Sequence, residues 1–157
     1  MHIPIRRKDR ETSREEALVI LDNSSWGVLS MVDSNNEPYC IPLSFVRDGE
    51  WLYFHCAMEG FKLEILRQRP KVSIAFVGGA EFPDDKFTVI YESAVVFGTA
   101  LEVSSNEEKI HGLRILSERF TPKNMPAFDK EVNQMLPRTL VWKIHIDEIT
   151  GKRRKKP

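Results

Sequence analysis

Short turns join the first apolar segments of this chain, and they leave room only for antiparallel strands. Residues 27–32, 39–46 and 51–56 are rich in apolar and β-branched side chains. Turn-forming residues separate them at 33–38 and at 47–50, where an Asp-Gly pair favours a hairpin. A parallel pair would need a crossover of about a dozen residues, which these turns are too short to provide. We therefore predict an antiparallel meander, with the third segment central because both of its faces are apolar.

The remaining pattern adds more strands and a few inserted helices. Helices are predicted at 13–22, 61–68, from 106 onward, and near 128–136; the first has capping-box spacing at both Thr12/Glu15 and Ser13/Glu16. Strands are predicted at 71–77, at 87–103 as two segments or one strand bulged near 91–93, and at 140–146, with a loop at 78–86. Because no βαβ rhythm is present, we expect a mainly β protein, a six-stranded antiparallel barrel in a single domain over residues 1–157.

Composition excludes several classes of partner. The 23 basic and 23 acidic residues give a formal net charge of zero, so the chain as a whole has no electrostatic reason to bind nucleic acid or an anionic membrane. No segment approaches the ~20 apolar residues of a membrane span, and residues 1–14 are too charged for a signal peptide. We expect a cytoplasmic protein with Cys40 and Cys56 reduced. The basic residues at 152–157 could contact nucleic acid or membrane, but a disordered end is the prediction.

The segment 54–62, with the sequence Phe-His-Cys-Ala-Met-Glu-Gly-Phe-Lys, is the main candidate for a binding site. It has the pattern of a strand end, a tight turn at Gly60 and the first turn of a helix. The helix start offers unpaired N–H groups and the positive end of the dipole, and Lys62 adds a full charge. These features together suit a phosphate group, although an ordinary strand-turn-helix with a solvated lysine fits the same spacing.

Other candidate residues are weaker signals. Pro42 cannot donate to a strand ladder, so it marks an edge or a bulge where backbone groups are free for a ligand or simply face solvent. His55 is a candidate catalytic residue or a satisfied core histidine. Cys56 follows it directly, so their side chains should point to opposite faces and cannot form a dyad. Histidine and cysteine spacing gives no metal motif, and none of the common nucleophile or nucleotide-binding motifs is present.

Several blocks in a fixed order resemble a known family. They are Arg6-Arg7-Lys8-Asp9-Arg10, Gly27-Val28-Leu29-Ser30, Pro38-Tyr39-x-Ile41-Pro42-Leu43, Tyr53-Phe54-His55-Cys56-Ala57-x-x-Gly60-x-Lys62, Tyr91-Glu92-Ser93-x-x-Val96-x-Gly98 and Glu148-Ile149-Thr150-Gly151-Lys152. This set is similar to the pyridoxamine 5′-phosphate oxidase-like flavin proteins, in particular their 5-nitroimidazole-resistance branch. The resemblance covers nearly the whole chain, and residues 53–62 are its most specific part.

The resemblance implies a split β-barrel of six antiparallel strands and a homodimer with FMN at the subunit interface. It implies that Lys62, with the turn at Glu59 and Gly60, holds the FMN phosphate. Further cofactor-binding residues would be Ile41, Pro42, Leu43 and Ser44 along the flavin ring, His55, Cys56 and Ala57 near the ring or ribityl chain, and Tyr91, Glu92 and Ser93 from the same or the partner subunit. The extra basic residues with which the true oxidase grips pyridoxal phosphate have no counterpart in the sequence 150–157.

Three functions follow as hypotheses. The first is an FMN-dependent oxidoreductase that reduces a small aromatic or nitro-type electrophile, because a phosphate site without an acid–base set is typical of a protein whose cofactor carries the chemistry. The second is a flavin carrier or sensor without turnover. The third is a haem protein on the same barrel, with His55 or His145 as axial ligand.

Overall fold

The computed structural model describes residues 4–154, which form one antiparallel sheet with inserted helices. The α-helices are α1 (Arg14–Asn23), α2 (Phe61–Gln68), α3 (Asn106–Phe120) and α4 (Phe128–Met135). Short 3-10 turns occur at η1 (Lys8–Arg10), η2 (Pro122–Ala127) and η3 (Leu136–Arg138). The strands are β1 (Gly27–Val32), β2 (Pro38–Leu43), β3 (Val46–Asp48), β4 (Trp51–Cys56), β5 (Lys71–Glu81), β6 (Ile90–Glu102) and β7 (Leu140–Arg154).

The sheet order differs from the predicted meander. The strands follow the order β2-β1-β5-β6-β7-β4-β3, so the hairpin β1–β2 and the hairpin β3–β4 lie at opposite ends of the order. The predicted strand 39–46 is in fact two strands, β2 and β3, which raises the strand number from the expected six to seven. The meander prediction is right for the two hairpins, β1–β2 and β3–β4, and wrong between them, because residues 39–46 break into β2 and β3, and the other edge of β4 pairs with β7, far along the chain.

A two-residue link turns this sheet into a barrel. β2 ends at Leu43 and β3 begins at Val46, so Ser44 and Phe45 alone connect the two ends of the sheet order. The sheet must therefore curl until its two ends meet. Phe45 marks the closure from inside: it is 3% exposed, and its ring centroid lies 5.5 Å from Phe54 and 5.7 Å from Phe76 in edge-to-face contacts. No ladder joins β2 to β3 in the described sheet, so this is a split barrel, which confirms the expected fold class.

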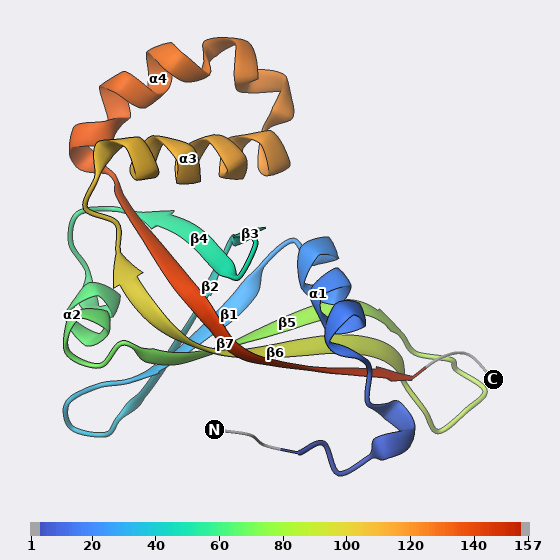
Figure 1. Cartoon of the computed structure of the whole chain (residues 1–157). Coiled ribbons are helices and arrows are strands. Elements are labelled where there is room, and N and C mark those ends of the chain that lie inside the picture. The colour runs from blue at the N-terminus through green and yellow to red at the C-terminus, as the bar shows by residue number, and fades with distance from the viewer. Residues whose placement is uncertain (1–3, 155–157) are drawn as a thin grey trace.

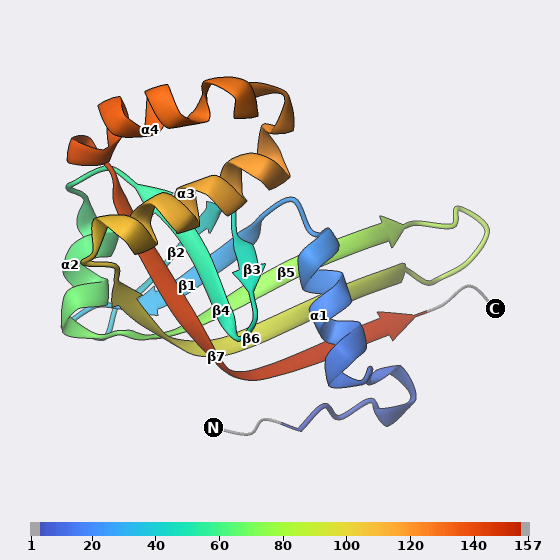
Figure 2. The same ribbon diagram turned by 45° about the horizontal axis from the view of Figure 1, so that its top comes forward.

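Helices cover the barrel unevenly (Figures 1 and 2). α1 packs across β5, β6 and β7, while α3 lies on β3, β4 and β7 with α4 stacked outside it. The capping box of α1 is the one at Ser13 and Glu16. α3 explains why β4 is apolar on both faces: Leu52 and Phe54 face the barrel core, whereas Tyr53 is buried under α3 in a second cluster. The prediction of a doubly buried strand is confirmed, and β4 lies between β7 and β3.

Three further predictions need correction. The tail was expected to be disordered from residue 152, but Lys152, Arg153 and Arg154 continue β7 and pair with β6; residues 155–157 lie outside the described part. The expected loop at 78–86 begins later, because β5 runs to Glu81. The irregularity predicted near 91–93 is present, but β6 is one strand; the extra residue is on β5, between Val77 and Ala80.

Candidate functional site

The turn between β4 and α2 has the geometry expected of a binding site. Gly60 is the N-cap of α2, with φ +139° and ψ 153°, a conformation that L-residues rarely adopt. No side chain caps the helix, so the first-turn N–H groups point outward without a side-chain acceptor. Because the helix dipole is positive at this end, the turn offers an anion both donors and a favourable field.

Lys62 adds its charge to the same place. Its Nζ atom lies 3.8 Å from the position that a Cβ on Gly60 would occupy, so the ammonium group stands over the open turn. Among residues 4–154, no carboxylate forms an ion pair with it. The charge also reaches Cys56: burial raises the pKa of this thiol, and the proximity of Lys62 partly opposes the rise. A full positive charge without a partner, beside an open helix start, suits a phosphate monoester.

The edge strand β2 borders this turn. It is the terminal strand of the order, as Pro42 predicted, so one side of its backbone carries no ladder. Tyr39 packs edge to face against Phe61, with ring centroids 5.3 Å apart, which holds the start of α2 beside β2. Ile41 and Leu43 turn toward the core, while Pro42 and Ser44 are exposed. The structure thus brings the residues 41–44 and 59–62 to the same end of the barrel.

His55 and Ser44 line an apolar cavity of about 310 Å³ between the barrel and the helices α3 and α4. The ring of His55 is exposed at this cavity, yet the surrounding residues withdraw enough water to lower its pKa. Cys56 turns the other way and packs against the main core, so the predicted opposite orientation of the two side chains is confirmed. At neutral pH His55 is therefore an uncharged imidazole facing an apolar space.

The apolar wall of this cavity was not predicted as part of a site. Its members come from α3, α4 and the segment between them: Leu113, Leu116, Phe120, Phe128, Val132 and Met135. Phe120 is 36% exposed and Met135 is 45% exposed, although their helices bury another face, so both side chains remain accessible from the cavity. The sequence alone does not reveal this exposure.

Tyr91, Glu92 and Ser93 lie elsewhere in the chain. They begin β6, where they pair with Arg154, Arg153 and Lys152 at the far end of the sheet from α2 (Figure 1). Glu92 accepts a 2.9 Å hydrogen bond from Arg153. These residues are not brought together with Lys62 within one chain.

In the described part of the chain no cluster of His, Cys, Asp and Glu is arranged to hold a metal. None of the described helices has the length and apolar character to cross a membrane.

The family follows from a sequence match over most of the chain. Residues 13–153 match the family model described as pyridoxamine 5′-phosphate oxidase. The chain therefore belongs to the pyridoxamine 5′-phosphate oxidase-like family, as the ordered blocks predicted, and its split barrel agrees with this assignment. A search of curated proteins gave no match.

Solved structures agree on the fold. A candidate 5-nitroimidazole antibiotic resistance protein from Bacteroides thetaiotaomicron has a TM-score of 0.74 and 26% identity, covering 89% of this chain and 83% of the other. A FAD- and haem-binding protein from Mycobacterium smegmatis has a TM-score of 0.77 and 22% identity, covering 94% and 74%. A FAD-binding protein from Mesorhizobium loti has a TM-score of 0.68 and 22% identity, covering 94% and 97%. Two of these three structures are thus of proteins named for binding FAD.

Proposed function

We propose that this protein is a flavin-dependent oxidoreductase that binds FMN. The observation that carries the proposal is the open start of α2 with the ammonium group of Lys62 above it, which pairs with no carboxylate of residues 4–154; together they form a cradle for one phosphate group. The edge strand β2 beside it has backbone groups free to meet the polar edge of a flavin ring. The FAD-binding proteins of the same fold support a flavin as the cofactor, and the single phosphate cradle is the reason to propose FMN. When bound, the flavin would supply the transfer of electrons, singly or as hydride.

The residues of the cavity would position the electron acceptor. Its wall is mostly apolar, which suits a flat molecule such as a small aromatic or nitro compound. His55 is uncharged at neutral pH, so its ring can donate a hydrogen bond from one nitrogen and accept one with the other. Ser44 adds a hydroxyl at the same cavity. The protein would therefore contribute orientation and hydrogen bonds, with no charged group needed to hold the substrate.

We further propose a homodimer that uses the outer face of the sheet. This face exposes Val28 at 37%, Val32 at 42% and Val77 at 60%, and no helix covers it in the described chain. It is continuous with β2, because Val28 pairs with Pro42. Ser93 lies at the far end of the same face, opposite Val77 in the β5–β6 ladder. A partner sheet docked here with its strands reversed in direction would bring the partner's residues 91–93 toward the flavin site.

The test is a visible absorption spectrum of the purified protein, followed by mass analysis of the compound released on denaturation. Flavin bands and released FMN are expected. Lys62→Met should then weaken FMN binding by about tenfold or more while leaving riboflavin binding unchanged, because only FMN carries the phosphate. Lys130→Met, an exposed lysine on α4, is the matched control. A colourless protein that takes up no added FMN would refute the proposal.

Two alternatives are separated by the same sample. A flavin carrier or sensor would bind FMN but would not oxidise NADH or NADPH with a nitroaromatic acceptor. A haem protein would show an intense Soret band; the feature that favours it is His55, a neutral imidazole at an apolar cavity, which is a suitable axial ligand. His55→Ala would abolish that band, whereas His145→Ala would leave it unchanged.

A further inference from the structure

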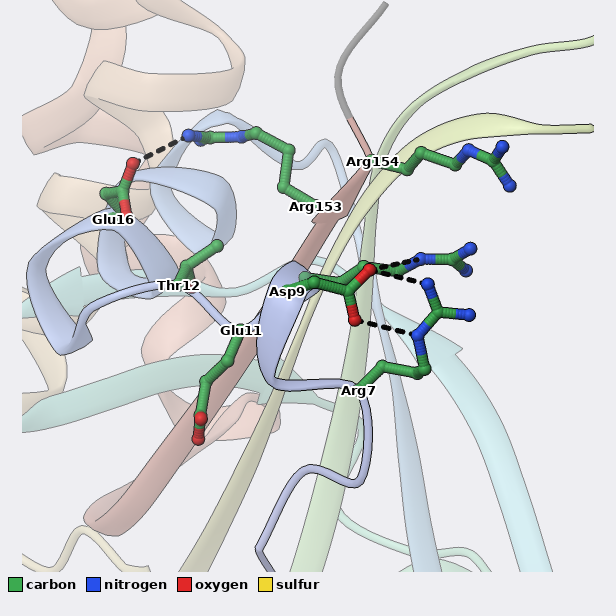
Figure 3. A pocket seen from close by; sticks show the side chains of 8 residues that line it. Arg7, Asp9, Glu11, Thr12, Glu16, Arg153 and Arg154 are labelled. Carbon is green, nitrogen blue, oxygen red and sulfur yellow. Dashed lines mark hydrogen bonds and ion pairs between the residues drawn. The ribbon is translucent and has the colours of Figure 1, made fainter. Parts of the chain in front are cut away.

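Two basic segments from opposite ends of the sequence meet at one pocket (Figure 3). The N-terminal segment lies against the end of β7, where the amide of Thr12 donates a 3.0 Å hydrogen bond to the carbonyl of Gly151. This pairing places the side chains of η1 beside those of the last β7 residues. The pocket has a volume of about 420 Å³, and its basic lining residues are Arg7, Arg10, Arg153 and Arg154.

Part of this charge is already neutralised inside the protein. Arg153 bonds to Glu16 and to Glu92, each at 2.9 Å. Arg7 forms a forked pair with Asp9 through bonds of 2.7 and 2.5 Å. Arg153 therefore links β7 to α1 and β6, Arg7 is paired within the N-terminal segment, and both have few donors left for a ligand.

The other two arginines keep their donors. Arg10 has a side chain only 21% exposed, yet its nearest carboxylate oxygen, on Asp9, is 3.9 Å away, beyond hydrogen-bond distance. Within residues 4–154, Arg154 has no ion-pair partner, and Figure 3 shows its guanidinium group on the same side as that of Arg7. Glu11 does not compensate them, because Lys8 holds it at 2.6 Å. An anion can accept hydrogen bonds from the remaining N–H groups of a partly desolvated guanidinium that lacks a full set of acceptors.

The shape of the site indicates what kind of anion. Guanidinium groups match phosphate oxygens through paired donors, better than they match a monatomic ion. A second cavity of about 220 Å³ adjoins the pocket and shares Arg153 and Arg154 with it; its other lining residues are Gly79, Glu81, Ile90, Tyr91 and Glu92, of which Glu92 is paired with Arg153. An aromatic ring with an aliphatic neighbour is a suitable surface for a nucleobase. The combined space is larger than one phosphate group requires.

We propose that Arg10 and Arg154, with Tyr91 beside them, bind the phosphate groups of a nucleotide. The site lies at the opposite end of the sheet from α2, so within one chain it is separate from the cradle of Lys62 (Figure 1). Its nucleotide has two chemical sources: a free pyridine nucleotide that donates electrons, or the adenylate half of a flavin dinucleotide. Both present phosphate and adenine to the same residues.

The experiment is calorimetric titration of the full chain with adenosine 2′,5′-bisphosphate, at low and at moderate salt. We compare the double variant Arg10→Gln/Arg154→Gln with Arg138→Gln, an exposed arginine that has no carboxylate partner in the described chain. The double variant leaves the ion pairs of Arg7 and Arg153 intact, so it should fold, which circular dichroism checks. We expect binding that weakens with salt, a loss of about tenfold or more in the double variant, and less than about twofold in the control.

Flavin content, measured on the same samples, distinguishes a free pyridine nucleotide from the adenylate half of a flavin dinucleotide. It also separates the test of this site from the test of the Lys62 cradle. For a free donor, the double variant keeps its flavin and loses affinity for NADPH; for an adenylate half, it loses preference for FAD over FMN. Either result supports the site. No binding by the wild-type protein at millimolar concentration, or equal losses in the double variant and the control, would overturn it. Such a failure leaves the Lys62 cradle untouched, because that cradle is tested by the comparison of FMN with riboflavin.

Discussion

Replacing Gly60 with alanine tests the cradle most directly, because the backbone there is strained for any L-residue. At φ +139° and ψ 153° an alanine costs about 1–3 kcal/mol. Steric overlap adds nothing, since beyond its chain neighbours the nearest described atom to the new Cβ is Lys62 Nζ, at 3.8 Å. The free energy of unfolding should therefore fall by about 1–3 kcal/mol, and Tm by about 2–4 °C for each kcal/mol. In addition, the methyl group would occupy the space between the helix start and the ammonium group.

Gly49 supplies a matched control. It also has a positive φ, +58°, and its added Cβ would meet no atom within 4 Å, but it lies in the β3–β4 turn. Gly49→Ala should cost about 1–2 kcal/mol and leave flavin binding unchanged. Gly60→Ala should lose stability and also weaken FMN binding by about tenfold, the effect of one lost charge-assisted contact.

Thermal unfolding measures the first quantity for both variants, and fluorescence titration with FMN measures the second. If Gly60→Ala binds FMN as tightly as Gly49→Ala does, the turn does not hold the phosphate. If Gly60→Ala is as stable as the wild-type protein, the backbone at residue 60 is not strained in the way described here.

Three further predictions concern stability and are measured by urea unfolding. Phe45→Ala should lower the free energy of unfolding by about 3–5 kcal/mol, because its buried ring fills the closure of the barrel. Tyr53→Phe should cost about 0.5–1.5 kcal/mol, since it removes the 3.0 Å hydrogen bond to Glu108. His55 has a pKa below its ordinary 6.5 because of burial, so the unfolded state binds the proton more readily and stability should fall as the pH drops below about 6.5.

Each has a comparison that can refute it. Phe120→Ala, which removes a ring of the same size from an exposed site on α3, should cost much less than Phe45→Ala. Tyr39→Phe, whose hydroxyl has no recorded bond within the described chain, should be nearly neutral, so an equal cost would contradict the role given to Tyr53. His55→Gln should flatten the acid side of the stability profile, and an unchanged profile would show that another group causes the loss.

The sequence by itself determined the local elements and the position of the proposed phosphate cradle. The limits predicted for residues 27–32 and 61–68 are those of β1 and α2, because turn residues and proline act on their immediate neighbours. Gly60 and Lys62 were identifiable for the same reason: the strand end, the turn and the helix start are contiguous. The ordered blocks predicted the family, which the match over residues 13–153 confirms.

Only the tertiary structure decided which distant segments meet. Local patterns predict the hairpins β1–β2 and β3–β4 but carry no information on the pairing of β4 with β7; the two-residue link at Ser44 and Phe45 then closes the sheet on itself. The apolar cavity exists because α3 and α4 pack beside His55, far along the chain. The tail residues Arg153 and Arg154 are ordered because β6 offers an open ladder and Glu16 and Glu92 offer charge. These contacts form only when the whole sheet is assembled, since each joins groups that no local propensity brings together.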